Sequence, residues 1–200
     1  MNVRFAAPAD YVRQEVIGKR EVRWQRLREL IEQRSLLRGN FKLSSGLTSN
    51  FLFQLRQTTM YPEGQYLIGT IILDFMKQHG IRSIGGLELG AVPVVSAVSF
   101  ASFLQKEPVD AFFVRKQAKA HGACELIDGE LPDGSDVLMV DDVTTSGGSI
   151  VTAIDNARTE KSCEVRWALS IVDRDQGAAK KLGERGISFA SIFTRSDFGL

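Results

Sequence analysis

The clearest structural signal in the chain is Val137-Leu138-Met139-Val140-Asp141-Asp142-Val143-Thr144-Thr145-Ser146-Gly147-Gly148-Ser149-Ile150. Residues 137–140 are uniformly apolar, which predicts a strand that is buried on both faces. We expect this strand to stop at the two adjacent carboxylates, Asp141 and Asp142. A loop of Thr, Ser and Gly follows, and residues 149–158 can form a helix. A strand, a Gly-rich loop and a helix in this order indicate an α/β protein.

The loop has the composition of a phosphate-binding turn. Gly147 and Gly148 tolerate positive φ angles and leave the backbone open to a ligand, and the following helix offers free N–H groups and the positive end of its dipole. Many Gly-rich turns bind nothing, but two adjacent acids at a strand end are costly unless something binds them. Asp141 and Asp142 repel phosphate and suit hydroxyl groups or a metal ion. The segment therefore predicts a site for a phosphorylated sugar.

Composition narrows the class of protein. The 200 residues suffice for one domain with a substantial core. Because 25 Lys and Arg stand against 24 Asp and Glu, a net charge of +1, a dominant nucleic-acid-binding surface is not expected. Cys124 and Cys163 lack Cys-x-x-Cys spacing, which favours reduced thiols in a cytoplasmic protein over a zinc site or a disulfide. Residues 1–10 do not resemble a secretory signal, and the apolar stretch 90–104 is too short and too polar to span a membrane.

Hydrophobic periodicity predicts helices at 24–37, 63–79, 91–104, 149–158 and 178–183, and strands at 81–87, 109–114, 137–140, 165–172 and 187–192. A short hairpin is expected within 41–54, after Gly39 and Asn40 end the first helix. This order predicts an α/β fold with a mainly parallel sheet. Three polar clusters, at 88–90, 141–149 and 173–175, follow the carboxyl ends of strands, where ligands bind in open α/β sheets.

A run of cations begins where the strand 109–114 ends. It contains Arg115, Lys116, Lys119 and His121, separated by small residues that provide little apolar anchorage. An exposed loop of solvated cations is one interpretation. Beside the candidate site, however, these four side chains together favour a pyrophosphate, and the weakly anchored segment is expected to move as a lid.

Several motifs resemble those of a known family. The apolar strand, two acids, Val and Thr-x-Gly-Gly-Ser resemble the phosphoribosyl diphosphate (PRPP) signature of the type I phosphoribosyltransferases. Arg-Lys-x-x-Lys-x-His-Gly at 115–122 resembles the catalytic loop of the orotate phosphoribosyltransferases. Phe41-Lys42-Leu43-Ser44-Ser45-Gly46-Leu47-Thr48-Ser49 resembles that family's N-terminal hood, and Ile171-Val172-Asp173-Arg174 resembles its late strand ending in Asp-Arg.

The resemblance covers the chain from about residue 22 to the C-terminus. It implies the type I phosphoribosyltransferase fold, with a mainly parallel central sheet flanked by helices, a small N-terminal hood at about 22–60 and a flexible lid loop. Residues 22–200 would form a single phosphoribosyltransferase domain, preceded by an N-terminal extension at 1–21. The family also implies a homodimer in which the lid of one subunit serves the site of the other. From the charge balance and the lack of a long apolar span, nucleic-acid and membrane partners are not expected.

The resemblance assigns roles to particular residues. Asp141 and Asp142 would hold the ribose hydroxyls, and Leu89 and Gly90 would meet the pyrophosphate. The 5′-phosphate would lie in a cradle made of Thr144, Thr145, Ser146, Gly147, Gly148 and Ser149. The four lid cations would close over the pyrophosphate, with Lys119 and His121 nearest to catalysis. Orotate would be bound by Phe53, Thr145 and Arg174. For Arg174, a local salt bridge with Asp173 or Asp175 is an equally weighted alternative.

The implied reaction is displacement at C1 of PRPP by a ring nitrogen of orotate, with pyrophosphate as the leaving group. It would form orotidine 5′-phosphate in de novo pyrimidine synthesis. Mg²⁺ held through PRPP, with Asp141 and Asp142 as candidate ligands, would act with the lid cations on the charge that develops on the leaving group. No side-chain nucleophile is required.

Three alternatives stay open on sequence alone: a phosphoribosyltransferase for another base, a PRPP-sensing regulator, and a paralogue that binds substrate without turnover. The chain departs from the family pattern at three places. Ser44 stands where many members carry Lys, Gly90-Ala91 where many carry Lys or Gly-Gly, and Leu52-Phe53 where an aromatic pair is expected. These departures bear on the affinity and specificity for the acceptor base more than on the binding of PRPP.

Overall fold

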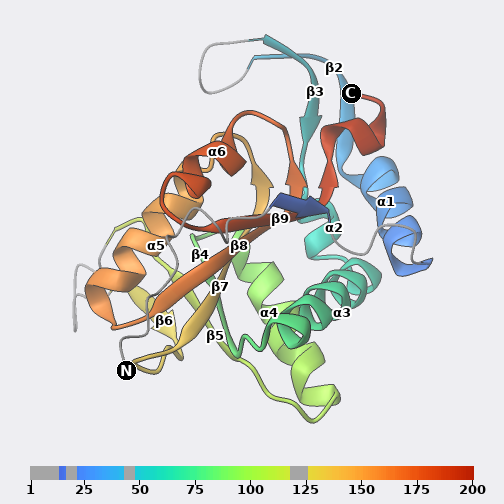
Figure 1. The fold of residues 1–200 in the computed structure, drawn as a ribbon. Coiled ribbons are helices and arrows are strands. Elements are labelled where there is room, and N and C mark those ends of the chain that lie inside the picture. Colours follow the sequence, from blue (N-terminus) through green and yellow to red (C-terminus); the bar gives the residue numbers. More distant parts are fainter. Residues whose placement is uncertain (1–13, 17–21, 43–47, 118–125) are drawn as a thin grey trace.

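The computed structural model describes residues 14–16, 22–42, 48–117 and 126–200 (Figure 1). Its strands are β1 (Gln14–Val16), β2 (Leu36–Lys42), β3 (Thr48–Phe53), β4 (Ser83–Gly86), β5 (Asp110–Val114), β6 (Ile127–Gly129), β7 (Asp136–Thr144), β8 (Glu164–Asp173) and β9 (Ser188–Thr194). Its helices are α1 (Val22–Arg34), α2 (Arg56–Thr59), α3 (Pro62–His79), α4 (Ala91–Leu104), α5 (Gly148–Glu160), α6 (Ala178–Gly183) and the 3₁₀ helix η2 (Arg195–Phe198).

Most of the strands belong to one sheet in the order β1-β9-β8-β7-β4-β5-β6. Its neighbouring strands run parallel, except that β5 and β6 are antiparallel. The strands β2 and β3 form a separate antiparallel hairpin. The predicted mainly parallel sheet is therefore confirmed. Because β4, β7 and β8 are adjacent and parallel, their carboxyl ends meet at one edge.

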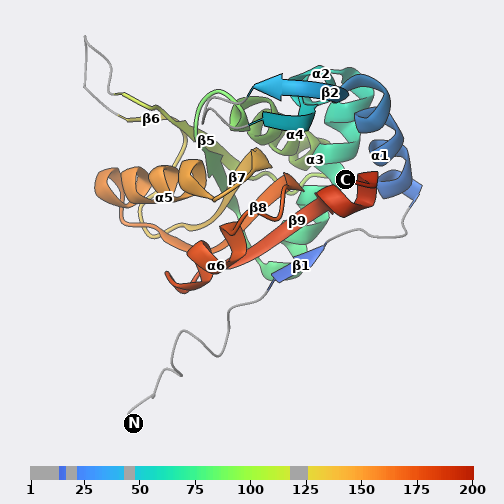
Figure 2. The same ribbon diagram turned by 90° about the horizontal axis from the view of Figure 1, so that it is seen from above.

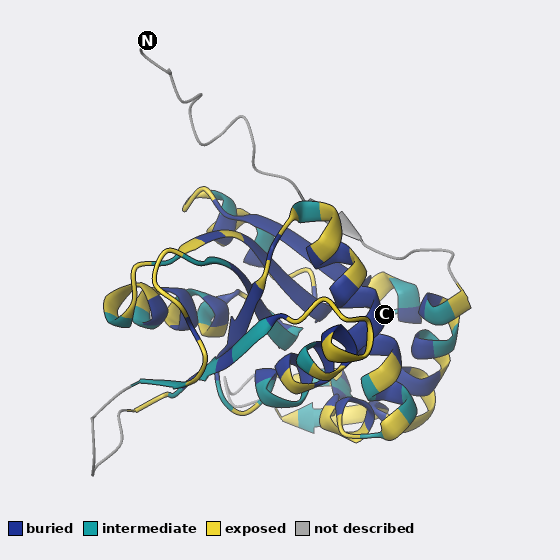
Figure 3. Cartoon of the chain, turned by 90° about the horizontal axis from the view of Figure 1, so that it is seen from below, coloured by how far each residue is buried: buried dark blue, intermediate teal, exposed yellow. Residues whose placement is uncertain are grey.

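The sheet is covered by helices on both faces (Figure 2). Val137 and Met139 of β7 pack with residues of α5 and α6, whereas Leu138 and Val140 pack with residues of α1, α3 and α4. All four side chains are fully buried, and Figure 3 shows the central strands as the most buried part of the molecule. The apolar run at 137–140 thus lies at the centre of the sheet, as its sequence predicts.

The helix α3 begins at a proline and ends before a glycine, as its sequence predicts. Pro62 is its first residue, where the missing N–H costs no hydrogen bond. Gly80 ends it with a φ of 67°, and its N–H donates to the carbonyl of Lys77 at 3.2 Å. A left-handed conformation of this kind suits glycine, which has no Cβ to clash with the backbone. The predicted range 63–79 is confirmed to within one residue.

The first helix ends earlier than its periodicity predicts. The helix α1 ends at Arg34, and Leu37, Gly39 and Asn40 lie in β2 instead of the end of a helix. The reason is cross-strand pairing: Leu36 lies opposite Phe53 in the hairpin, and both side chains are buried. This contact between distant residues favours a strand over continuation of the helix. The predicted hairpin is confirmed, but it begins at Leu36.

Three further elements differ from the expectation. Gln14–Val16, inside the predicted extension, forms β1 and pairs in parallel with β9, so it adds a strand to the main sheet. The short elements α2 and β6 have no clear sequence signal. None of the described helices has the length and apolar character needed to cross a membrane. Cys163 is a half-buried free thiol, and Cys124 lies outside the described residues.

The strand β7 also continues beyond its predicted end. Asp141 and Asp142 belong to the strand and not to the loop that follows it, because pairing with β8 continues through them. Asp141 lies opposite Ser170, and Thr144 lies opposite Asp173. The backbone of both acids is therefore fixed by the sheet, while their side chains stand at its edge.

Candidate active site

The three polar clusters predicted at strand ends lie at one edge of the sheet. The turn 87–90 follows β4, the loop 145–147 follows β7, and Arg174 and Asp175 follow β8. The N–H of Arg174 donates to the carbonyl of Thr144 at 2.9 Å, which ties the ends of β7 and β8 together. The prediction that the three clusters meet at one edge is confirmed, and the strands that precede them hold their positions.

A cavity of about 320 Å³ opens between the ends of β4, β5 and β7. It is lined by Arg56, Leu87, Glu88, Leu89, Gly90, Lys116, Asp141, Asp142, Val143 and Ser149. Gly90 lies directly against the acids: a Cβ at this position would be 2.6 Å from Oδ1 of Asp142 and 3.3 Å from Oδ1 of Asp141. Only glycine lets the turn approach the carboxylates this closely. The structure thus brings together the two acids predicted for the ribose with the Leu89–Gly90 turn predicted for the pyrophosphate.

The two carboxylates have an unusual electrostatic environment. Burial raises the pKa of Asp141 to about 8, and the negative charge of Asp142 adds to this shift. Oδ1 of Asp141 accepts a hydrogen bond from the N–H of Asp142 at 3.0 Å, which acts in the opposite direction. Oδ1 of Asp142 accepts one from the N–H of Val143 at 2.8 Å. The ionised form of Asp141 is therefore unfavourable in the free protein, and a bound hydroxyl donor or cation would stabilise it.

The shifted pKa of Asp141 predicts how stability depends on pH. Its folded-state pKa lies above its ordinary value of 3.8, so between about pH 4 and 8 the folded state holds a proton that the unfolded state has lost. Stability therefore falls as pH rises through this window. Asp141→Asn is expected to gain stability over the wild type with rising pH, by about 4 kcal/mol between pH 5 and pH 8. Chemical denaturation at pH 5 to 8 measures this difference.

The exposed Glu130→Gln provides the control for this measurement, because its stability should follow that of the wild type at every pH. Curves for Asp141→Asn and the wild type that stay parallel from pH 5 to 8 would show that Asp141 ionises normally in the free protein.

The predicted phosphate loop has the expected backbone. Gly147 adopts a φ of 76°, and α5 begins at the next residue. A Cβ on Gly147 would lie 3.4 Å from the backbone of Ala178, so the loop is also packed closely. Thr144 is buried, and its Oγ1 has no hydrogen-bond partner in the described structure. The first turn of α5 presents amides without intrahelical acceptors to this loop.

The side chain of Arg174 is buried without a carboxylate partner in the described part of the chain. Its guanidinium lies 4.8 Å above the ring of Phe51, only 7% of the residue is exposed, and Nε has no hydrogen-bond acceptor. Burial lowers its pKa, with a smaller effect from the charge of Arg195. The alternative of a local salt bridge is not observed, because Asp175 pairs with Arg195 instead, at 3.9 Å.

Phe53, assigned to orotate on sequence grounds, packs inside the base of the hairpin. Its ring contacts Phe198 at 5.3 Å and Phe51 at 5.7 Å between centroids, and 8% of the residue is exposed. Phe51 is the hairpin residue whose ring meets Arg174. The role of Phe53 in binding a base stays a prediction, and this packing gives it an additional structural role beneath the hairpin.

The predicted lid cations occupy different positions. Lys116 lines the cavity, and its N–H donates to Oε1 of Glu88 at 2.9 Å. Nε of Arg115 donates to Oδ2 of Asp128 at 2.5 Å, across the β5–β6 pair. Lys119 and His121, like Ser44 in the hairpin loop, lie outside the described residues. Of the described lid cations, Lys116 is therefore the one placed at the cavity.

Arg56 lines the cavity but was not predicted from the sequence, and Glu88 lines it from within the predicted cluster 88–90, in which it had been assigned no role. Glu88 stands next to the predicted Leu89–Gly90 turn, so its place after a strand was a usable signal. Arg56 follows the hairpin and starts the short helix α2. Nothing in its local sequence connects it to the sheet edge, which it reaches through the packing of α2 against α1, α3 and α4.

Comparisons with known proteins agree with this geometry. A model of the phosphoribosyl transferase domain matches residues 71–190. The orotate phosphoribosyltransferase of Bradyrhizobium sp. (strain ORS 278) is 41% identical over 177 residues, which cover 86% of this chain and 95% of the relative. This chain belongs to the orotate phosphoribosyltransferase family. The enzyme of that name from Aquifex aeolicus is 38% identical over 86% of this chain and 96% of its own length.

A solved structure of the same family is also similar. The crystal structure of Mycobacterium tuberculosis orotate phosphoribosyltransferase in complex with PRPP matches with a TM-score of 0.76 and 32% identity, over 89% of this chain and 99% of that chain. The type I phosphoribosyltransferase fold implied by the sequence motifs is therefore confirmed.

Proposed function

We propose that this chain transfers the phosphoribosyl group of PRPP to orotate, forming orotidine 5′-phosphate and pyrophosphate. The main support for this proposal is the environment of Arg174, which is a buried cation without a carboxylate partner among the described residues. It stands at the end of β8, bonded through its backbone to the start of the phosphate loop. Orotate brings a carboxylate, whose two oxygens suit a guanidinium. An acceptor base bound here would lie beside a sugar held by β7.

The rest of the site supports displacement at the ribose C1. Asp141 and Asp142 accept hydrogen bonds from the ribose hydroxyls, and the loop before α5 holds the 5′-phosphate. Lys116 and the turn at Leu89 and Gly90 face the pyrophosphate. The ring nitrogen of orotate forms a bond to C1 as the bond from C1 to the pyrophosphate oxygen breaks. Negative charge then grows on the leaving group, where fixed cations stabilise it most.

The donor set at the cavity fits Mg²⁺ carried by the substrate. The carboxylates of Asp141 and Asp142 are hard oxygen ligands of the kind that Mg²⁺ prefers, and the raised pKa of Asp141 indicates a group that gains from a nearby cation. The described residues contain no group of three or more acidic, His or Cys side chains arranged so that they could hold a metal ion on their own. Most of the coordination would therefore come from PRPP oxygens and water, and the ion would add positive charge at the leaving group.

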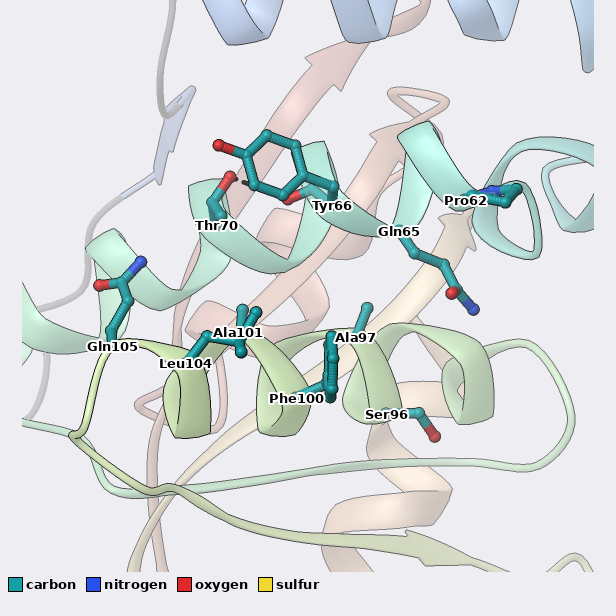
Figure 4. A pocket seen from close by; sticks show the side chains of 10 residues that line it. All are labelled: Pro62, Gln65, Tyr66, Thr70, Ser96, Ala97, Phe100, Ala101, Leu104 and Gln105. Atoms are coloured by element: carbon teal, nitrogen blue, oxygen red, sulfur yellow. Dashed lines mark hydrogen bonds between the residues drawn. The ribbon is translucent and has the colours of Figure 1, made fainter.

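A homodimer is supported by an apolar ridge on α4. Phe100, Phe103 and Leu104 are 65%, 72% and 62% exposed. A hollow of about 600 Å³ separates this ridge from Tyr66 of α3 (Figure 4). A second hollow, of about 480 Å³, lies toward β5 and β6, the strands that flank residues 118–125. Exposed apolar patches of this kind mark protein interfaces, and a partner on this face would lie beside the base of the lid.

Phe100→Asp is expected to convert the dimer to a monomer, because it places a charge in the middle of the apolar ridge. Analytical ultracentrifugation measures the change in mass. Val22→Asp is the matched control, since Val22 is 82% exposed but lies on α1. A Phe100→Asp protein that sediments as the wild type does would rule out the α4 ridge as the interface.

Turnover with a panel of bases tests the proposed acceptor. The protein is incubated with PRPP, Mg²⁺ and, separately, orotate, uracil, adenine or hypoxanthine, and the nucleotide products are quantified. Orotate is expected to be the preferred acceptor. Faster turnover with a base that lacks a carboxylate would assign the chain to another phosphoribosyltransferase activity. PRPP binding without turnover of any base would indicate a regulator or a paralogue that binds without catalysis.

A further inference from the structure

Arg56 is an exposed cation at the candidate site. It is the first residue of α2, between the hairpin and α3, and it lines the cavity together with Leu89, Gly90 and Lys116. Its guanidinium has no hydrogen bond or ion pair in the described structure, whereas the arginines of α1 nearby are paired; Arg26, for example, binds Glu63 at 2.7 Å. An arginine that lines a polar cavity without a protein partner is available to a ligand.

The charges of the cavity indicate what this ligand is. Its described lining holds three carboxylates, those of Glu88, Asp141 and Asp142, against the two cations Arg56 and Lys116. The carboxylates disfavour a polyanion unless the cations lie on its side of the cavity. Arg56 and Lys116 come from separate segments, α2 and the end of β5, and both line the same cavity as the Leu87–Gly90 turn. The turn therefore shares its cavity with one cation on the hairpin side, Arg56, and one on the lid side, Lys116.

We propose that Arg56 binds the pyrophosphate group of PRPP, as a substrate-binding residue on the hairpin side of the site. This assignment rests on the proposed function and adds a residue to it. A guanidinium presents its donors in a planar fork that can bond two phosphate oxygens at once. Arg174 lies in a different, buried position at the end of β8, so the two arginines divide the anionic groups of the two substrates between them.

The test measures binding of inorganic pyrophosphate with Mg²⁺ to the full chain by isothermal titration calorimetry. Arg56→Ala is expected to weaken binding by about 10- to 100-fold, and Arg56→Lys is expected to recover part of this loss because it keeps the charge without the fork. Arg82→Ala is the matched control: Arg82 is also exposed and unpaired in the described structure, but it precedes the opposite, amino end of β4. Melting temperatures of all variants verify folding.

Steady-state kinetics add a readout that a purely structural role would not change. Arg56→Ala is expected to raise the KM for PRPP while the KM for orotate stays near the wild-type value. Pyrophosphate affinity equal to that of Arg82→Ala would overturn the assignment, as would a rise in the KM for orotate alone, which would place Arg56 at the acceptor. If the wild type bound neither pyrophosphate nor PRPP, the proposed function itself would fail, and this assignment with it.

Discussion

Lys119→Ala is expected to lower kcat by about 100- to 1,000-fold, while the Kd for PRPP rises by less than about tenfold. Lys119 lies outside the described residues, three positions after Lys116, which lines the cavity. The family resemblance implies that Lys119 contacts the pyrophosphate leaving group. Its charge then matters most in the transition state, where negative charge accumulates on the pyrophosphate, and less in the ground state.

Steady-state turnover and calorimetric PRPP binding separate these two effects. Lys161→Ala is the matched control, because Lys161 is an exposed lysine at the end of α5, and its removal should change neither quantity. Unchanged turnover in Lys119→Ala would remove the lid from the chemistry. A loss of PRPP affinity as large as the loss of turnover would make Lys119 a binding residue, with the transition-state stabilisation coming from elsewhere.

Arg174→Gln is expected to lower kcat/KM for orotate by about 100-fold or more, with little change in the Kd for PRPP. The glutamine keeps polar atoms near the same place but loses the charge that would pair with the carboxylate. The variant should be at least as stable as the wild type, because it removes a buried cation whose pKa is lowered by desolvation and by Arg195. Loss of activity without loss of stability distinguishes a ligand-binding residue from a structural one.

Kinetics with orotate, calorimetry with PRPP and chemical denaturation of the same preparation measure all three quantities. Arg195→Gln is the control, since Arg195 is the exposed neighbour that pairs with Asp175. An Arg174→Gln enzyme with wild-type kcat/KM for orotate would exclude Arg174 from the acceptor site. A variant that is destabilised and weak toward both substrates would indicate that Arg174 supports the hairpin through Phe51.

The sheet and its functional edge could be predicted because their signals are local. An apolar run such as 137–140 specifies a buried central strand, and the direction of parallel strands then places every following loop at the same edge. Gly147 and Gly148 likewise indicate a phosphate-binding turn by themselves, because glycine both tolerates a positive φ angle and leaves the backbone open to a ligand. These features do not depend on which distant residues they meet, so the sequence alone indicates them.

Other features depend on contacts between distant residues. The end of α1 is set by the pairing of Leu36 with Phe53, and β1 exists only because residues 14–16 meet β9. Arg56 reaches the cavity through the packing of α2 against α1, α3 and α4. The environment of Asp141 has the same origin: its raised pKa requires burial at the end of β7, which a loop position would not provide. None of these contacts has a signature within its own segment.

The stoichiometry of the reaction tests the central claim most directly. The wild-type protein is mixed with PRPP, orotate and Mg²⁺, and orotidine 5′-phosphate and pyrophosphate are quantified over time. Transfer to orotate by displacement at C1 predicts that both products form in equal amounts and that neither forms when orotate is omitted. Pyrophosphate released without the nucleotide, or PRPP left unconsumed in the presence of orotate, would contradict the proposed activity.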